Sequence, residues 1–367
     1  MQQRSPWQDF DWGLLVIAIA LTIIGLAMIY SATLGAEDPA LANTWRRQAI
    51  YGAIGVGLMF LVASVDYRLL ESLEWPIYFV TIGVLIFTLL FGTSEIGAVR
   101  RFIYIGGISV QPAFPALLLL IISQASLLAR NAPDPPGWRE FVGSLGLTAL
   151  AAFLVFEQPN LSTATLYLAS WAVMVFTSGL HLGFIAGVGA VGLAAVPVLW
   201  TNMDSYMQQR VTNFLDPTAD PGAYYNVQQA LISIGSGGLW GKGYATGTQS
   251  QLHFLRVRHT DFIFSVICEE LGFIGAGLIL LVFGVLLWRL LRIAGSTEDI
   301  TGRLIVSGVA TYVFYQLLVN LGMNLNVIPV AGLPMPFISS GGSALVVTFI
   351  GLGLVESVAM RQRRLEF

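Results

Sequence analysis

The stretch that decides the fold is His259-Thr260-Asp261-Phe262-Ile263-Phe264, which opens an apolar run that reaches about residue 292. A polar, glycine-rich insertion precedes it, and its centre reads Ile234-Gly235-Ser236-Gly237-Gly238-Leu239-Trp240-Gly241-Lys242-Gly243. The apolar run is long enough to cross a bilayer as a helix. It contains Glu269 and Glu270, and acidic residues at membrane depth need a partner or a cavity, which makes both functional candidates.

Composition gives the class of protein. Of the 367 residues, 56% are hydrophobic and 11% are charged, whereas a soluble domain carries about 25% charged residues. Hydrocarbon forces backbone groups to pair within their own segment, so long apolar runs predict spanning helices. We therefore predict an all-α integral membrane protein, a single polytopic domain over residues 1–367, with about ten transmembrane helices at 12–33, 47–65, 74–92, 113–129, 141–157, 160–178, 182–200, 262–292, 303–322 and 342–360.

Arginine placement predicts the orientation of these helices. Most arginines outside the long insertion fall on the side of both termini, and the short loops opposite hold only Arg46, Arg47, Arg100 and Arg101. By the positive-inside rule, both termini are cytoplasmic and the insertion at 201–261 is extracytoplasmic. The net charge is −3, with Lys242 as the single lysine, which suggests neither nucleic-acid binding nor polybasic attachment to lipid.

The insertion at 201–261 is predicted to contain an amphipathic helix that lies at the membrane interface. The apolar residues that recur at helical spacing are Tyr224, Val227, Leu231 and Ile234. The glycines that follow let the backbone bend and approach a ligand closely. A flexible loop that crosses the surface is the alternative.

A second irregular segment runs from residue 320 to residue 343, where three prolines within eight residues exclude a regular helix. Broken backbone at membrane depth survives where protein or a water-filled cavity covers it, so this segment is predicted to line a site. A simple hydrophobic turn is the alternative. In a third segment, Arg100 and Arg101 suit phosphate recognition or, equally, snorkelling to lipid headgroups.

Three separated stretches together resemble the SEDS family (shape, elongation, division and sporulation), which includes RodA and FtsW. They are the glycine-rich run at 235–243 with Gly247-Thr248-Gln249-Ser250, the run from His259 to Gly272, and Gly332-Leu333-Pro334-Met335-Pro336-Phe337-Ile338-Ser339-Ser340-Gly341-Gly342-Ser343. The likeness spans the chain, including ten helices and a large outer loop between helices seven and eight. The short tails are similar to those of the RodA branch.

The resemblance implies a peptidoglycan glycosyltransferase. Such an enzyme polymerises lipid II, an undecaprenyl diphosphate-linked disaccharide peptide, at the outer face of the bacterial cytoplasmic membrane during cell elongation. Its implied partner is a class B penicillin-binding protein transpeptidase. The family's essential aspartate corresponds to Asp261, with supporting motif residues His259, Thr260, Glu269 and Glu270. The other motif positions expected to bind substrate are Gln249, Ser339 and Gly341.

The chain departs from the family at a charged pair. Family members carry a glutamate and a lysine at the start of helix four, where this chain has Phe114 and Leu117, and an aspartate where it has Asn160. Losing both partners of a buried pair leaves neither charge stranded, so we expect the first change to be compensated.

Joining two lipid-linked sugars requires a base near the attacking hydroxyl group and positive charge near the departing diphosphate. Asp261 stands where the outer loop meets helix eight, and desolvation there favours its action as a base, so we predict it as the general base. The alternative is that Asp261 merely opens the helix, behind a Thr260 cap. One of Glu269 and Glu270 is expected to pair with an arginine near the inner side.

Five outer cations are available for the diphosphate. Arg101, Arg210 and Lys242 are favoured over Arg256 and Arg258, although spacing does not show which of them converge. A divalent cation, Mg²⁺ or Mn²⁺, could share this duty, as the family and the reaction type suggest. The carboxylates and histidines show no recognisable ligand spacing, so the metal stays unassigned.

Two other functions fit the same sequence. A lipid II flippase would explain the many helices, the intramembrane acids and the broken helix, which transporters share. An inactive scaffold that activates a transpeptidase would explain the missing charged pair. Polymerisation of lipid II in detergent separates these functions from the enzyme, because flipping needs a sealed membrane.

Overall fold

The computed structural model describes residues 6–93, 101–105, 108–132, 134–218, 220–252, 254–255 and 257–362. Arg100, His253 and Arg256 lie outside the described residues. Most described residues are helical, and one antiparallel hairpin joins two short strands. The elements are η1 (Pro6–Asp9), α1 (Trp12–Thr33), α2 (Pro39–Ala42), α3 (Thr44–Ser64), η2 (Tyr67–Leu73), α4 (Glu74–Phe91), β1 (Ile103–Ile105), β2 (Ile108–Val110), α5 (Ala113–Leu128), α6 (Trp138–Phe156), α7 (Leu161–Thr177), α8 (Leu182–Asn202), α9 (Ser205–Leu215), α10 (Pro221–Ser236), α11 (Thr248–Gln251), α12 (Ile263–Ser296), α13 (Ile300–Asn324) and α14 (Gly342–Gln362).

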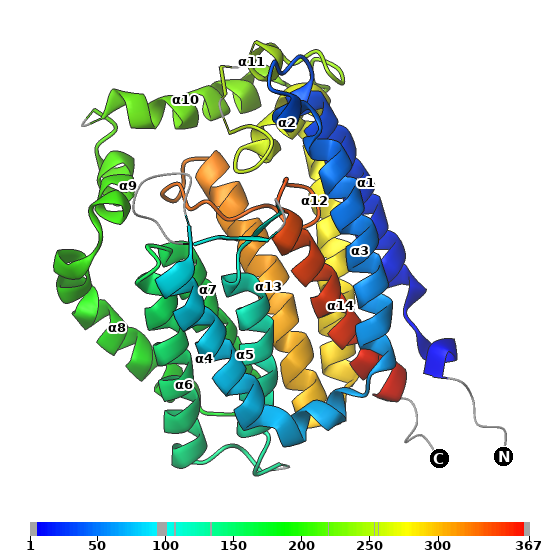
Figure 1. Ribbon diagram of the computed structural model, residues 1–367, viewed down its shortest axis with the longest axis vertical. Helices are drawn as coiled ribbons and strands as arrows, with labels where there is room; N and C mark the ends of the chain where they lie inside the picture. The colour runs from blue at the N-terminus through cyan, green and yellow to red at the C-terminus, as the bar shows by residue number, and fades with distance from the viewer. Residues whose placement is uncertain are drawn as a thin grey trace.

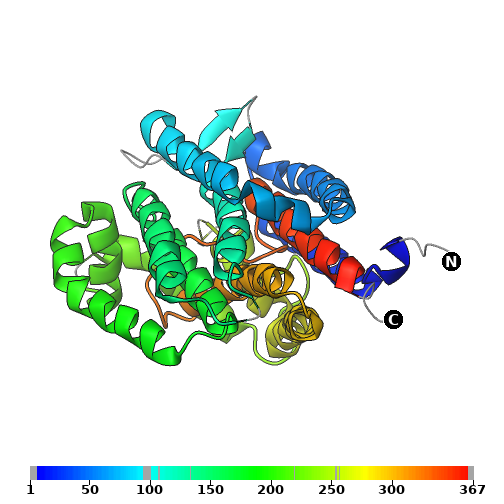
Figure 2. The same cartoon turned by 90° about the horizontal axis from the view of Figure 1, so that it is seen from below.

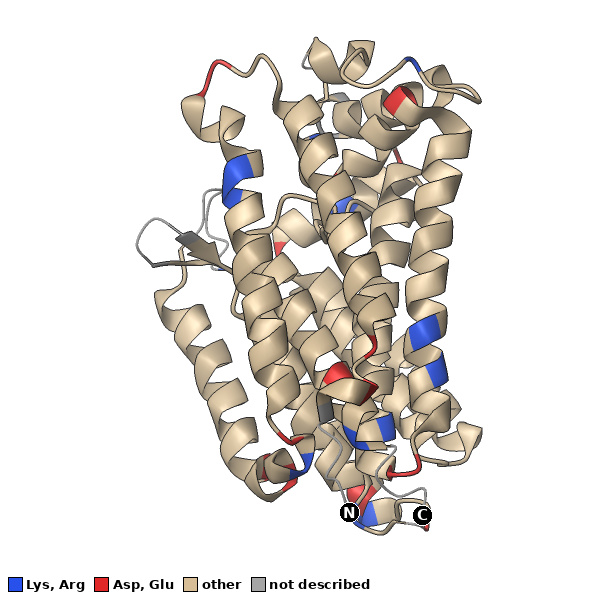
Figure 3. Ribbon diagram, turned by 90° about the vertical axis from the view of Figure 1, so that its right-hand side faces the viewer, with Lys and Arg blue, Asp and Glu red and all other residues tan. Residues whose placement is uncertain are grey.

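The predicted membrane fold is confirmed. Among the described residues, 8 helices are long and apolar enough to cross a membrane, and two shorter apolar helices, α5 and α7, stand at the remaining predicted places. Figure 1 shows these helices side by side in one bundle, with η1 and the end of α14 at one end and α10 and α11 at the other. Lysine, arginine, aspartate and glutamate residues gather toward these two ends (Figure 3).

Helices α13 and α14 form the core of the bundle, since most of their side chains are buried. Helix α14 packs closely on α3, and a Cβ atom on Gly353 would lie 2.6 Å from the carbonyl oxygen of Met59. Helix α8 is the opposite case. It is described throughout, has no buried residue and lies at the edge of the bundle (Figures 1 and 2).

Helix α12 is interrupted, which corrects the prediction of one continuous helix. Gly272 has φ 70° and ψ −173°, a conformation that glycine adopts without steric penalty. The backbone of the glycine-rich segment fills the break. The N–H of Lys242 donates to the carbonyl of Glu269 (2.9 Å), and the N–H of Phe273 donates to the carbonyl of Gly238 (2.9 Å).

The close approach predicted for these glycines is made to α12. A Cβ atom on Gly237 would lie 1.9 Å from the carbonyl oxygen of Cys268, and one on Gly241 would lie 2.2 Å from that of Glu270. Only glycine fits at such separations, so the glycines of this run allow its backbone to pack against the broken part of α12.

The loop between α8 and α12 contains α9, α10 and α11. Helix α10 lies across one end of the bundle (Figure 1), packs on α12 and α13, and buries Val227 and Ala230. The predicted amphipathic helix is therefore present, with part of its apolar face covered by protein. Its position at a lipid interface remains a prediction.

The irregular segment is shorter than the predicted 320–343, because residues 320–324 end α13 and residues 342–343 begin α14. Residues 325–341 between them form no helix, as the prolines predict. Leu333, Met335, Phe337 and Ile338 are buried. Protein therefore covers this broken backbone, and the simple-turn alternative does not describe it.

The positions of the missing charged pair are packed with apolar side chains. Phe114 and Leu117 are buried, and the Phe114 ring lies edge-on to Tyr312, with 6.2 Å between ring centroids. This packing agrees with the expected compensation, because no charge is left without a partner there.

Candidate active site

Asp261 stands at the corner where the loop enters α12, and several side chains fix the backbone there. Its carbonyl oxygen accepts hydrogen bonds from the side-chain amides of Asn324 (2.9 Å) and Asn320 (3.2 Å). The hydroxyl group of Ser339 donates to the carbonyl of Thr260 (2.7 Å). The corner is thus held by α13 on one side and by residues 325–341 on the other.

The Asp261 carboxylate and the Arg210 guanidinium both lie near Gly332. A Cβ atom on Gly332 would lie 3.6 Å from Arg210 Nη1 and 3.9 Å from Asp261 Oδ2. Gly332 has φ 67°, a conformation in which other residues are strained. Arg210 Nη1 also donates to the carbonyl of Val330 (3.2 Å). The Cα atom of Gly332, which carries no side chain, thus lies close to both the Asp261 carboxylate and the Arg210 guanidinium.

A second arginine joins this pair through Tyr206. The Tyr206 ring lies 4.4 Å from the Arg210 guanidinium and 5.6 Å from that of Arg101, and its hydroxyl group accepts a hydrogen bond from Arg210. Arg101 Nε donates to the carbonyl of Gln158 (3.2 Å). Tyr206 therefore places two guanidinium groups on one aromatic ring, a favourable arrangement for cations.

A cavity of about 240 Å³ adjoins these groups. It lies between α7, α9, α13 and residues 328–331. Asp261 is not one of its lining residues, but the Asp261 carboxylate lies near Gly332, which follows the lining residue Ala331. The polar residues that line it are Arg101, Asn160, Ser162, Thr165, Tyr206, Arg210 and Tyr315. With two cations in its lining and one acid beside it, the site favours an anionic ligand.

The electrostatic environment suits a base next to an anion site. Burial raises the pKa of Asp261, and the positive charges of Arg210 and Arg101 oppose that rise. Burial lowers the pKa of Arg101 to about 10, so this arginine stays protonated at neutral pH. Burial, with the neighbouring Arg258, lowers the pKa of His259 to about 4, so this histidine is neutral at pH 7 and supplies no charge.

Glu269 belongs to a separate polar cluster. Its carboxylate accepts hydrogen bonds from the ammonium group of Lys242 (2.8 Å), the N–H of Gln249 (2.9 Å) and the N–H of Ser250 (3.2 Å). Lys242 is absent from the lining of the cavity beside Asp261. The structure therefore gathers Lys242, Gln249 and Glu269 into a clamp on the loop around α11.

Glu270 ties the same loop to α1. Its carboxylate accepts from the hydroxyl group of Ser31 (2.5 Å) and from the N–H of Ala245 (3.1 Å). The expectation that one of these two acids pairs with an arginine near the inner side is wrong. The partner of Glu269 is Lys242, from the end of the bundle that bears α10 and α11.

The profile of the cell cycle protein family of FtsW, RodA and SpoVE matches residues 11–364. The chain belongs to this family. The peptidoglycan glycosyltransferase MrdB of Escherichia coli (strain K12) is 37% identical over 99% of this chain and 97% of its own length.

Solved structures agree with this family assignment. Thermus thermophilus RodA is 31% identical, with 98% of this chain and 100% of that chain covered and a TM-score of 0.72. A chain from a peptidoglycan synthase complex that coordinates polymerization and crosslinking is 31% identical over 97% of this chain and 99% of its own, with a TM-score of 0.80. The resemblance to the SEDS proteins is confirmed.

The alternative role of Asp261, as an anion that opens the helix behind a Thr260 cap, is not supported in its second part, because the Thr260 cap is absent. The residue that caps α12 is Phe262, and no side-chain hydrogen bond is made from it. The Thr260 hydroxyl group instead donates to the carbonyl of Val257 (3.3 Å). Asp261 therefore lies one residue ahead of the N-cap of α12, where the positive charge of Arg210 acts on its carboxyl group.

Ser339 and Gly341 support the site from behind. The side-chain amide of Gln48 donates to the carbonyl of Ser339 (3.0 Å) and accepts from the N–H of Gly341 (3.2 Å). The N–H of Ser340 donates to the carbonyl of His259 (2.9 Å). These motif residues thus position the Asp261 corner through backbone and hydroxyl contacts.

Sequence reasoning missed Tyr206, Asn320, Asn324 and Gln48. Two signals were present. Tyr206 precedes Arg210 by four residues, and Asn320 precedes Asn324 by four, so each pair shares a helix face. No signal tied Gln48 to a segment 291 positions away. A metal remains unassigned, because the described residues hold no group of three or more potential His, Cys, Asp or Glu ligands.

Proposed function

We propose that Asp261 is the general base of this chain, which is a peptidoglycan glycosyltransferase like the relatives that match it along nearly its whole length. Its substrate would be lipid II, polymerised into glycan strands for cell elongation and shape. The observation that carries the proposal is that the Asp261 carboxylate and the Arg210 guanidinium both lie near Gly332, next to a cavity lined by Arg210 and Arg101.

The proposed step uses these groups in two roles. A sugar hydroxyl oxygen forms a bond to the anomeric carbon of a second lipid-linked sugar, while the bond from that carbon to the diphosphate oxygen breaks. The hydroxyl proton passes to the Asp261 carboxylate. The electron pair leaves with undecaprenyl diphosphate, whose negative charge lies near Arg210 and Arg101. No step requires Lys242, which the Glu269 carboxylate already binds.

The test uses the purified chain in detergent with its transpeptidase partner and lipid II. Asp261→Asn keeps the size of the side chain and removes the base, so polymerisation is expected to fall to background. Asp216→Asn is the matched control, because Asp216 is exposed and its carboxylate accepts hydrogen bonds from the nearby Thr218. Undiminished glycan synthesis by Asp261→Asn contradicts the proposal.

The same assay addresses the flippase and the scaffold. Glycan chains made in detergent support the enzyme, since a flippase acts only across a sealed membrane. A chain that makes no glycan in detergent but moves lipid II across vesicles would be a transporter. Stimulation of the transpeptidase by an Asp261→Asn chain that makes no glycan would show a separate scaffolding role.

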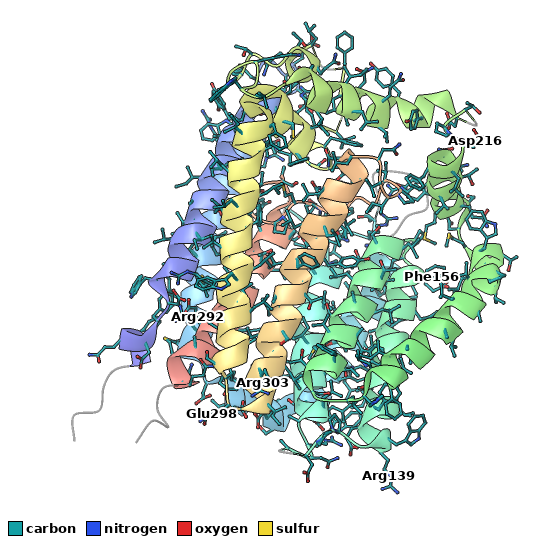
Figure 4. All side chains as sticks on the ribbon, turned by 180° about the vertical axis from the view of Figure 1, so that it is seen from behind. Arg139, Phe156, Asp216, Arg292, Glu298 and Arg303 are labelled. Carbon is teal, nitrogen blue, oxygen red and sulfur yellow. The ribbon has the colours of Figure 1, made fainter. Side chains whose placement is uncertain are left out.

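A class B penicillin-binding protein is the proposed partner. Its support is the solved neighbour, which was seen within a peptidoglycan synthase complex. We also propose that both termini are cytoplasmic and that Asp261 works at the outer face of the membrane. Figure 4 supports this orientation, because Arg139, Arg292 and Arg303 lie at the end of the bundle that holds η1, whereas Asp216 lies at the other.

A further inference from the structure

Four polar side chains are buried around the Asp261 corner in an otherwise apolar bundle. Gln48 is 2% exposed, Ser339 is 3% exposed, and Asn320 and Asn324 are 0% exposed. Burying an amide costs free energy unless its hydrogen-bonding groups are satisfied. All four side chains lie within one hydrogen-bonded cluster that reaches the backbone of residues 259–261 directly or through Ser339.

Asn324 performs two tasks with one amide. Its nitrogen donates to the Asp261 carbonyl (2.9 Å), while its oxygen accepts from the N–H (3.2 Å) and the hydroxyl group (2.7 Å) of Ser265. The first N–H groups of a helix have no partner within the helix. Since Phe262 provides no side-chain cap, Asn324 caps α12 from a neighbouring helix and holds Asp261 at the same time.

Asn320 connects the corner to the segment that carries Gly332. Its nitrogen donates to the carbonyls of Asp261 (3.2 Å) and Leu333 (2.9 Å). Leu333 adjoins Gly332, which lies near both the Asp261 carboxylate and the Arg210 guanidinium. One side chain therefore fixes the Asp261 backbone relative to the backbone against which its carboxylate rests.

We propose that Asn320 and Asn324 are positioning residues for the Asp261 carboxylate, and that Gln48 supports them through Ser339. This inference rests on the proposed role of Asp261 as the base. The two asparagines touch the backbone of Asp261 and not its carboxylate. They act by fixing the peptide plane that follows Asp261, and with it the direction in which the side chain leaves the backbone toward Arg210.

The consequence for the reaction is a matter of distance. General-base catalysis requires hydrogen-bond reach to the attacking hydroxyl group, and a misplacement of about 1 Å can cost about 100-fold in rate. Loss of the amides also frees Asp261 to move away from Arg210. The charged groups that act on Asp261 among the described residues are Arg210 from α9 and Arg101 ahead of β1.

The experiment compares Asn320→Leu, Asn324→Leu and Gln48→Leu with Gln124→Leu in the detergent assay. Gln124 is an equally buried amide, 1% exposed, that donates to Ser144 and Thr148 between α5 and α6. All four variants lose a buried amide. We expect the first three to lower the polymerisation rate at saturating lipid II by about 10- to 100-fold, and Gln124→Leu to keep its rate once variants are compared below their unfolding temperatures.

The pH profile separates positioning from simple damage to the fold. Partial unfolding lowers the rate equally at every pH. If Asp261 moves away from Arg210 while it stays buried, its pKa rises, so the acid limb of the profile of Asn320→Leu and Asn324→Leu moves to higher pH.

Each outcome has one meaning when Asp261→Asn is measured beside these variants. A fully active Asp261→Asn overturns the proposed base itself. An inactive Asp261→Asn with wild-type rates and an unmoved acid limb in both asparagine variants overturns the positioning role alone. A rate loss in Asn320→Leu and Asn324→Leu that Gln124→Leu matches, with no shift of the acid limb, also overturns it.

Discussion

The Asp261 carboxyl group is subject to two opposing effects. Burial raises its pKa, and the guanidinium groups of Arg210 and Arg101 lower it. A base that must be ionised at neutral pH benefits from such a balance, since burial favours the protonated form of Asp261 and makes it a stronger base, whereas the cations favour the ionised form. In the proposed step, Arg210 acts on the diphosphate as well as on Asp261.

Arg210→Gln separates these two effects. Loss of the charge removes one of the groups that lower the pKa of Asp261, so the rate is expected to begin its fall at a higher pH as the solution is acidified. Loss of the donor fork at the diphosphate is expected to cost about 100-fold at the optimum. The measurement is the polymerisation rate against pH in detergent.

Arg210→Lys is the control for charge. It keeps the positive charge but not the planar fork, so its acid limb should stay near that of the unmodified chain while its maximal rate falls. An unmoved acid limb in Arg210→Gln would show that Arg210 does not act on Asp261.

The loop around α11 is held by hydrogen bonds to Glu269 of α12, close to the break at Gly272. The Glu269 carboxylate is 0% exposed and accepts from Lys242 and from two backbone N–H groups of the loop. Lys242 was predicted to bind the diphosphate, and that role stays a prediction. Its ion pair offers a structural role for the same residue, and the two roles have different consequences.

Lys242→Met is expected to destabilise the chain, because it leaves the Glu269 charge buried without its cation. Removal of one partner of a buried pair costs about 3 to 5 kcal/mol, and the lower figure applies here because the Lys242 side chain is 27% exposed. Thermal unfolding in detergent measures this loss. The double variant Lys242→Met, Glu269→Met should recover much of it, since no charge is stranded.

Activity then decides between the two roles. Recovery of polymerisation in the double variant, beyond either single variant, indicates that Lys242 acts through Glu269. A double variant that is stable yet inactive would place Lys242 at the substrate.

The glycines of the same loop lie very close to the backbone of α12. Gly237→Ala places a Cβ atom within 1.9 Å of the Cys268 carbonyl oxygen, which is backbone and cannot rotate away. We expect a loss of about 3 kcal/mol or more from this overpacking. On α8, a Cβ atom on Gly189 meets no atom within 4 Å, so Gly189→Ala is the matched control. Equal unfolding temperatures for both variants would contradict the close packing.

Hydrophobicity determines some features of the whole molecule, and contacts between residues far apart in sequence determine others. The places of the spanning helices were predictable, because bilayer thickness sets the length of an apolar run. The irregular backbone at 325–341 followed from its prolines. The interruption of α12 did not, because Gly272 lies inside an apolar run and only the inserted backbone of the loop explains it.

The candidate site shows the same division. Asp261 was identified by its motif, and Arg101 and Arg210 were among the proposed cations. Their convergence was not predictable, because Arg101 and Asp261 are far apart in sequence. Tyr206 links Arg101 to Arg210, and Arg210 and Asp261 both lie near Gly332. Asn320 and Asn324 were visible as polar residues in a stretch predicted to be irregular, and neither their place at the end of α13 nor their partner Asp261 was predictable.

The orientation of the bundle in the membrane can be tested by cysteine labelling. Both described ends of the chain, η1 and the end of α14, lie at the same end of the bundle as Arg292 and Glu298, and Asp216 lies at the opposite end (Figure 4). The excess of arginine at the first end predicts that it faces the cytoplasm.

Asp216 and Glu298 are both exposed, whereas the only native cysteine, Cys268, is buried. In spheroplasts, a membrane-impermeant maleimide should therefore label Asp216→Cys at once, label Glu298→Cys only after permeabilisation, and leave the unmodified chain unlabelled. Labelling in the reverse order would place Asp261 on the cytoplasmic side, where lipid II polymerisation would have no access to the growing wall, and would overturn the orientation together with the proposed site of synthesis.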